Sequence, residues 1–110
     1  MQKFSLDDMV KGWFVGAFAP TALHTDAVEV GVKRYKAGDA EARHHHRIAT
    51  EVTVLLEGQA RMNGVVHGAG DILLIPPGES TDFHALTDLV TVVVKLPGAS
   101  HDKYDGDAPC

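Results

Sequence analysis

With 110 residues, the chain has room for one hydrophobic core but not for a second domain. Its composition, 45% hydrophobic and 23% charged, argues against a disordered, collagen-like or membrane protein. A net charge of −5, without any long run of Lys or Arg, argues against nucleic acid as a partner. No stretch stays apolar for the roughly 18 residues of a membrane span, and the start lacks a signal-peptide pattern, so we expect no membrane partner and a cytoplasmic protein. The single cysteine, Cys110, excludes an internal disulfide.

Gly and Pro recur about every 8–12 residues, and the segments between them are rich in Val, Ile, Leu and Thr, a pattern typical of all-β proteins. We expect a short helical turn over residues 5–10 with Ser5 as its cap, followed by strands over 13–18 and 27–35. Residues 50–56 are almost all β-branched or aliphatic, which predicts a strand covered on both faces.

The second half of the chain contains the clearest turn signals. Asn63-Gly64 predicts a tight hairpin between residues 60–62 and 65–66, because a type I′ turn needs positive φ at both central positions. Further strands are expected over 71–75, 81–86 and 90–96, and the tail from Ala99 onward looks loosely tied. So many short strands protect their edges only by closing or by pairing sheets, which predicts a single jelly-roll barrel.

Two histidines and a glutamate stand at a distinctive spacing. Five residues separate Gly38 from His44, one separates His44 from His46, four separate His46 from Glu51, and six separate Glu51 from Gly58. This spacing resembles the first sequence motif of the cupin family at every one of these positions. Gly70, Pro76 and Gly78, separated by five residues and by one, are similar to the opening of the second cupin motif.

The two motifs, at about 38–58 and about 70–86, together span residues 38 to about 86, roughly half of the chain. The resemblance implies that residues 1–110 form one cupin domain, an all-β double-stranded β-helix, in which 1–10 and 99–110 are peripheral. It also implies a homodimer, and pairing of protomers would cover the exposed strand edges of so short a chain.

The spacing suits a metal site. Residues i and i+2 of a strand share a face, so His44 and His46 converge while His45 points the other way, and a turn over 47–49 brings Glu51 to the same side. Two imidazoles and one carboxylate with open positions suit a divalent Fe, Mn, Ni, Co or Zn ion. The alternative is a cupin that keeps the shape without the metal.

The second motif departs from the family pattern. Thr81 stands where the family usually supplies a third metal-binding histidine, and a threonine can hold a metal-bound water but is a poor ligand. His84 is the less favoured fourth ligand, because its odd offset from Thr81 points it to the other face unless a bulge re-aims it.

We expect Thr81, Phe83 and Arg61 to line a pocket beside this site. Phe83 shares the face of Thr81. The guanidinium of Arg61 is suited to an anionic substrate, as are Arg43 and Lys33, although each of these three side chains also fits a solvated position on a strand.

The resemblance implies a metal-dependent enzyme of the dioxygenase, lyase or isomerase type that acts on a small oxygenated substrate. The alternative is a non-catalytic cupin that binds a small molecule or a sugar, and the Thr81 replacement favours it. No pattern in the sequence selects the substrate, the metal or the catalytic residues.

Overall fold

The structure, a computed structural model, describes residues 1–109, so Cys110 lies outside the described residues. Within them, two 3-10 turns, η1 (Leu6–Asp8) and η2 (Val10–Gly12), precede a series of strands. The strands are β1 (Trp13–Val15), β2 (Glu29–Tyr35), β3 (Ala40–His45), β4 (Thr50–Glu57), β5 (Gln59–Met62), β6 (Val65–Gly68), β7 (Ile72–Ile75), β8 (Thr81–Ala85), β9 (Leu89–Leu96) and β10 (Tyr104–Asp105). No helix in the described part of the chain is long and apolar enough to cross a membrane.

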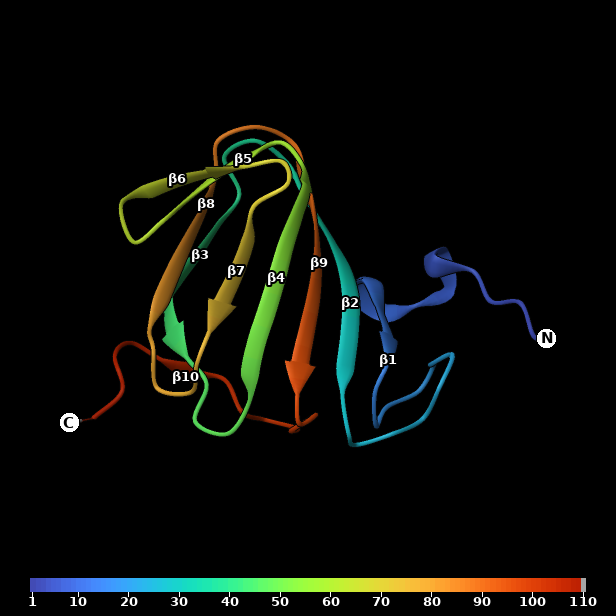
Figure 1. Cartoon of the computed structure of the whole chain (residues 1–110). Helices are drawn as coiled ribbons and strands as arrows, with labels where there is room; N and C mark the ends of the chain where they lie inside the picture. The colour runs from blue at the N-terminus through green and yellow to red at the C-terminus, as the bar shows by residue number, and fades with distance from the viewer. Residues whose placement is uncertain (110) are drawn as a thin grey trace.

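The strands form two five-stranded sheets, shown in Figure 1. One sheet has the order β1-β2-β9-β4-β7, and the other has the order β10-β3-β8-β5-β6. All strand pairs within the sheets are antiparallel. This arrangement confirms the all-β, two-sheet architecture that the rhythm of Gly and Pro predicts.

The hairpin at residues 63–64 is confirmed in detail. Asn63 and Gly64 both have positive φ, 49° and 78°, as a type I′ turn requires. Met62 and Val65 are directly paired on either side of the turn. Around this hairpin, the strands expected near 71–75, 81–86 and 90–96 all form.

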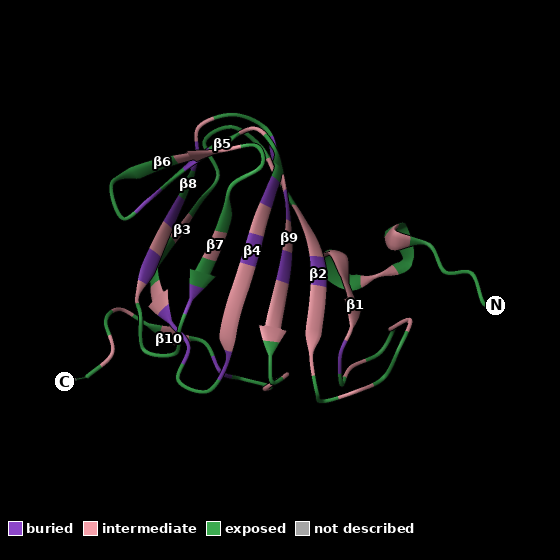
Figure 2. Cartoon of the chain, in the orientation of Figure 1, coloured by how far each residue is buried: buried purple, intermediate pink, exposed green. Residues whose placement is uncertain are grey.

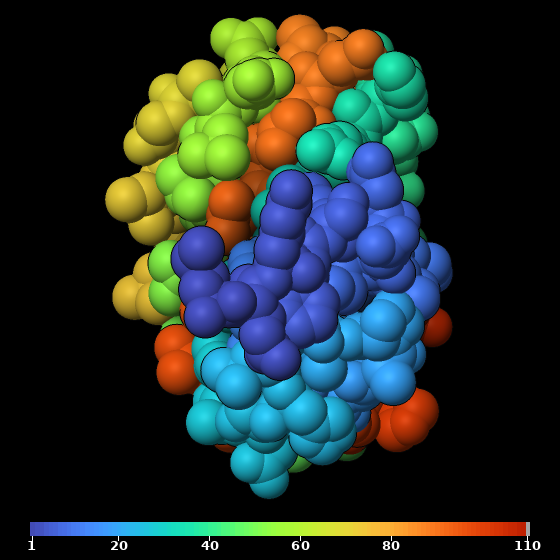
Figure 3. Space-filling view, turned by 90° about the vertical axis from the view of Figure 1, so that its right-hand side faces the viewer, coloured from blue at the N-terminus to red at the C-terminus, as the bar shows by residue number. Residues whose placement is uncertain are grey.

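Two local predictions near the N-terminus were wrong. The helical turn expected over 5–10 forms as the 3-10 turn η1, but Ser5 makes no side-chain capping hydrogen bond. The first strand ends at Val15 rather than 18, since the chain bends away from the sheet after Gly16. Figure 3 shows residues of the N-terminal segment, in dark blue, spread over the outside of this end of the molecule.

The prediction of a loosely tied C-terminal tail was also wrong. Tyr104 and Asp105 form β10, which pairs with β3 opposite His45 and His44. Asp102 is only 5% exposed, and its carboxylate binds the loop that follows β3. Residues 102–105 therefore close one edge of the second sheet.

The hydrophobic core gathers toward one end of the space between the sheets. Its buried members are Leu55, Ala60, Met62, Ile75, Phe83, Ala85 and Leu89. Along β4 and β9, buried positions alternate with half-buried ones, as Figure 2 shows. Polar side chains replace apolar ones toward the other end of the same inner face, where Glu51 and Lys95 lie directly opposite one another on β4 and β9.

The outer face of the first sheet is apolar and open. Directly opposed side chains form two rows across β2, β9, β4 and β7, namely Val32, Val92, Val54 and Ile72, and Val30, Val94, Val52 and Leu74. Ile72 and Leu74 are 69% and 66% exposed, and the valines are half-buried. The prediction that residues 50–56 are covered on both faces was therefore wrong for this chain by itself, because this face has no covering layer.

Candidate functional site

A cavity of about 250 Å³ lies between the two sheets at the polar end of the core. Its walls include His44, His46, Glu51, Thr81 and Phe83, so it brings together all three predicted metal ligands and two of the predicted pocket residues. A larger hollow of about 500 Å³ lies beside η1, η2 and β2 and contains none of these groups. The chemistry-bearing residues thus define the smaller cavity as the candidate site.

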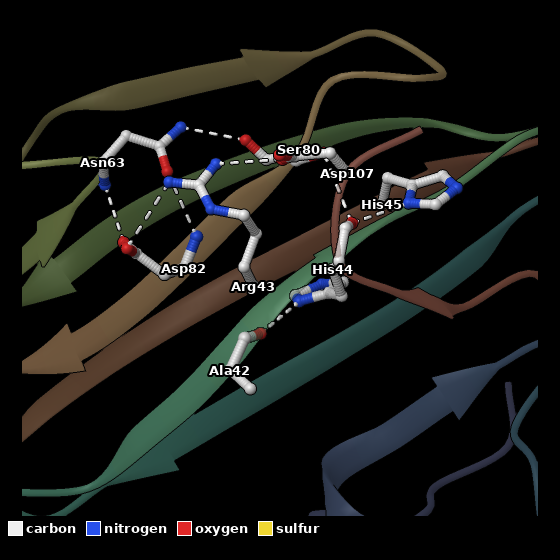
Figure 4. A network of polar contacts seen from close by, with 9 residues as sticks. Ala42, Arg43, His44, His45, Asn63, Ser80, Asp82 and Asp107 are labelled. Carbon is white, nitrogen blue, oxygen red and sulfur yellow. Dashed lines mark hydrogen bonds and ion pairs between the residues drawn. The ribbon is translucent and has the colours of Figure 1, made fainter. Parts of the chain in front are cut away.

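A register shift in β3 aims two side chains into this cavity. The pairing of β3 with β8 slips between Glu41 and His44, and both residues line the cavity although they are an odd number of positions apart. The Nδ1 atom of His44 lies 3.2 Å from the carbonyl oxygen of Ala42, as Figure 4 shows. That contact needs the proton on Nδ1, so in the neutral ring the lone pair is on Nε2.

His45 points away from the cavity and has a structural role. It is 2% exposed, and its Nδ1 atom lies 2.8 Å from the carbonyl oxygen of Gly106. Its ring stacks on Tyr104 of β10, with centroids 5.6 Å apart. Figure 4 shows His44 and His45 projecting in different directions from β3.

His46 lines the cavity and has one unpaired ring nitrogen. The side chain is 6% exposed, and its Nε2 atom is buried without a hydrogen-bond partner among residues 1–109. Its ring lies edge-on to His44, with centroids 5.4 Å apart. Burial, reinforced by the positive charge of Lys95, lowers the pKa of His46 to about 4, so the ring is neutral near pH 7. A neutral imidazole with a free lone pair is the form that binds metal ions.

Glu51 approaches the site from the opposite sheet. It lies near the start of β4, and its Oε2 atom accepts a hydrogen bond of 2.9 Å from the hydroxyl of Thr53. Thr53 shares the inner face of β4 because it is two residues further along the strand. The carboxylate is thus held at the cavity wall across from the two histidines.

Asp102 holds the loop between His46 and Glu51. Its Oδ1 atom accepts hydrogen bonds from the backbone N–H groups of Arg47 and Ile48, at 3.0 and 3.1 Å. Its Oδ2 atom accepts from Ile48 and Ala49, at 3.1 and 2.9 Å. Burial alone would favour the protonated acid, but the hydrogen bonds from these N–H groups outweigh it and lower the pKa of Asp102.

Two imidazoles and a carboxylate are suitable ligands for a divalent transition metal, although the three side chains do not form a preassembled site. No group of three His, Cys, Asp or Glu side chains within residues 1–109 is arranged as a ready metal site. The fit lies in the two neighbouring imidazoles, one of which has an orphaned buried nitrogen, and in a carboxylate on the facing wall. The hydrogen bond from Thr53 uses only Oε2 of Glu51, so Oε1 remains available to an ion.

The alternation of side chains along the strands places some of the remaining predicted residues in the cavity and others on the outer face. Thr81 and Phe83 are buried on the inner face of β8, and Thr81 is directly opposite His44. His84 is exposed on the outer face, so it does not reach the cavity as a fourth ligand. Arg61 pairs with His84, is likewise exposed, and does not line the cavity. The side chain of Arg43 instead forms ion pairs with acidic residues at the surface, as Figure 4 shows.

Sequence reasoning missed several groups that face the cavity. Lys11, Lys95, Lys103 and Trp13 line it beside Lys33, which alone among them was expected at the pocket. Their positions are far apart in the sequence and match no motif. The alternation of β9 alone places Lys95 on the same face as Thr91 and Val93, which was the available signal.

Tyr35 and Glu41 form a hydrogen-bonded pair in the wall of the cavity. The hydroxyl of Tyr35 donates to Oε1 of Glu41 at 2.9 Å, and the Tyr35 ring packs on Phe83 with centroids 4.5 Å apart. Burial, together with the negative charge of Glu41 and this hydrogen bond, raises the pKa of Tyr35, so the phenol stays neutral.

Comparison with known proteins places the fold. No family model matches the sequence, and no curated protein matches it significantly. Among solved structures, a protein with a double-stranded β-helix domain from Klebsiella pneumoniae is 23% identical with a TM-score of 0.69, over 96% of this chain and 92% of that one. The DMSP lyase DddQ from Ruegeria pomeroyi is 18% identical with a TM-score of 0.69, over 84% of this chain and 48% of that one.

A cupin superfamily protein from Desulfitobacterium hafniense is 13% identical with a TM-score of 0.61, over 66% of this chain and 69% of that one. Identities this low establish a shared fold and leave the activity to the site itself. The two antiparallel sheets and these likenesses together show that the chain has the cupin fold, a double-stranded β-helix.

Proposed function

We propose that the cavity binds one divalent transition metal through His44, His46 and Glu51, and that the protein is a metal-dependent enzyme acting on a small oxygenated substrate. The observation that carries this proposal is the buried, unpaired Nε2 atom of His46 beside the free Nε2 atom of His44. Buried polar atoms without partners are rare in folded proteins, and a metal ion would satisfy this one. The ion would be Fe, Mn, Ni, Co or Zn.

When bound, such an ion polarises a substrate oxygen or activates dioxygen, which is the chemistry of dioxygenases, lyases and isomerases. The protein supplies the surroundings. Thr81, which pairs with His44 on the neighbouring strand, contributes a hydroxyl to the cavity wall. Phe83, Met62 and Val93 form an apolar part of the wall that limits water in the cavity.

The experiment that tests the role of Glu51 is a calorimetric titration of untagged, chelator-treated protein with Co²⁺. Wild type is expected to bind one ion per chain, and Glu51→Gln to bind it at least about tenfold more weakly, since the amide loses the negative charge. Glu57→Gln is the matched control, because Glu57 is an exposed residue at the far end of β4. Equal affinities of Glu51→Gln and wild type would remove Glu51 from the ligand set.

A second candidate function is a cupin that binds a small molecule without catalysing a reaction. It is favoured by Thr81 at the place of a third histidine and by the lack of a ready three-donor cluster in the described residues. In that case, chelator-treated protein takes up no Co²⁺ at all, while a ligand still enters the cavity.

We also propose a homodimer formed through the outer face of the first sheet. The two apolar rows across β2, β9, β4 and β7 carry no charged side chain, and a second copy presents the same uncharged surface. Light scattering at micromolar concentration is expected to give the mass of a dimer for wild type and of a monomer for Val92→Glu, which puts a charge into the middle of the face. Leu23→Glu, at an exposed position elsewhere, is the control, and a monomeric wild type would contradict the proposal.

A further inference from the structure

The inner face of the first sheet carries a lysine pair built around the only tryptophan of the chain. The Nζ atom of Lys33, on β2, lies 5.5 Å from the centroid of the Trp13 ring, and that of Lys95, on β9, lies 5.1 Å from it. The two lysines come from different strands, and all three residues line the candidate cavity. The indole thus sets the positions of two ammonium groups at the cavity wall.

A glycine makes room for this arrangement. Gly31 is paired with Trp13 and is buried. A Cβ atom at residue 31 would lie 2.7 Å from the Trp13 ring, which is too close for any side chain. The indole therefore fills the place that a side chain of β2 would take between Lys33 and Lys95.

The charges around the cavity are unbalanced. Lys11, Lys33, Lys95 and Lys103 line it, and no residue within 1–109 forms an ion pair with any of these four. Two carboxylates also line it, those of Glu41 and Glu51, so the four ammonium groups outnumber them two to one. In a chain whose net charge is −5, this is a local concentration of positive charge.

Partial burial destabilises the charged form of Lys33. Lys33 is half-buried, and the loss of water around its ammonium is the main cause of its lowered pKa, while Glu41 acts in the opposite direction. A partly desolvated cation without an anionic partner gains most from a negatively charged ligand.

We infer that the cavity takes a small organic acid whose carboxylate is held between the ammonium groups of Lys33 and Lys95. This inference names the substrate class of the proposed metal site and rests on that site for its catalytic meaning. A cavity of about 250 Å³ is below the usual range for drug-sized ligands, which restricts the acid to a few carbon atoms. The lysines supply charge without the rigid fork of an arginine, and the described cavity wall includes no arginine.

The fluorescence of Trp13 reports on this subsite directly, because the chain has one tryptophan. Malonate is the probe, and titrations at constant ionic strength are made on protein as purified and after chelator treatment. We expect a saturable change in emission for wild type. Lys33→Gln/Lys95→Gln is expected to bind malonate at least about tenfold more weakly, since two charge-assisted contacts are lost. Lys36→Gln, on an exposed lysine that pairs with Asp88 outside the cavity, is the matched control and should bind as wild type does.

Three results would overturn the inference. These are no saturable response to malonate, equal binding by the double lysine variant, or equal binding of the neutral analogue malonamide. Tighter binding of inorganic phosphate than of malonate would overturn the assignment to carboxylates. Malonate binding that is unchanged in His44→Ala/His46→Ala shows that the subsite stands even where the proposed metal site fails.

Discussion

Asp102→Ala is expected to lower the free energy of unfolding by about 3–5 kcal/mol, a large part of the stability of a domain this small. The carboxylate of Asp102 accepts hydrogen bonds from the backbone N–H groups of Arg47, Ile48 and Ala49. Each N–H group that loses its acceptor costs about 1–3 kcal/mol, with the smaller values where water reaches it. Urea unfolding followed by Trp13 fluorescence measures the change.

Two variants separate the effect of the carboxylate from that of any change in the tail. Asp102→Asn keeps one acceptor oxygen but loses the charge, so its stability should lie between that of Asp102→Ala and that of wild type. Asp105→Ala removes an exposed carboxylate three residues further on and should change stability by less than about 0.5 kcal/mol. If Asp102→Ala were as mild as this control, the loop would not depend on Asp102.

The free energy of unfolding of the chelator-treated protein is expected to fall by about 3 kcal/mol between pH 7 and pH 4 through His46 alone. Burial first, and then the charge of Lys95, lower the pKa of His46 from 6.5 to about 4. Below pH 6.5, therefore, His46 is protonated in the unfolded chain, whereas in the folded protein it stays neutral until about pH 4. Stability is thus complete above pH 6.5 and is lost as the pH falls, by about 1.4 kcal/mol for each pKa unit.

The control for this pH dependence is His46→Gln, which places a neutral side chain at the same position. Between pH 7 and pH 4, the free energy of unfolding of His46→Gln should fall by about 3 kcal/mol less than that of wild type. His101→Gln, at an exposed position, should leave the wild-type slope unchanged. Parallel curves for wild type and His46→Gln would mean that the buried ring does not resist protonation.

Local spacing predicted much of the site because strand geometry is regular. Parity placed His44 and His46 on the cavity side, His45 on the other side, and His84 away from Thr81, and the structure has each of them there. The hairpin at residues 63–64 followed from the φ angles that its turn type requires.

The contacts that complete the site were outside the reach of such patterns. Asp102 binds a loop more than 50 residues away, and no periodicity in the tail marks it. The Trp13, Lys33 and Lys95 cluster depends on which strands become neighbours in the sheet, which a single sequence does not encode locally. For the same reason Arg61 was expected at the pocket, although it lies on the exposed face of β5.

The central claim is that His44 and His46 bind one divalent transition metal. Elemental mass spectrometry on untagged protein, purified without added metal, tests it most directly when wild type is compared with His44→Ala/His46→Ala. His67→Ala/His84→Ala, which removes two histidines outside the cavity, is the matched control. We predict about one Fe, Mn, Ni, Co or Zn ion per chain in wild type and in the control, and almost none in His44→Ala/His46→Ala. A wild type that is empty and cannot be loaded, or equal metal in all three proteins, would contradict the claim.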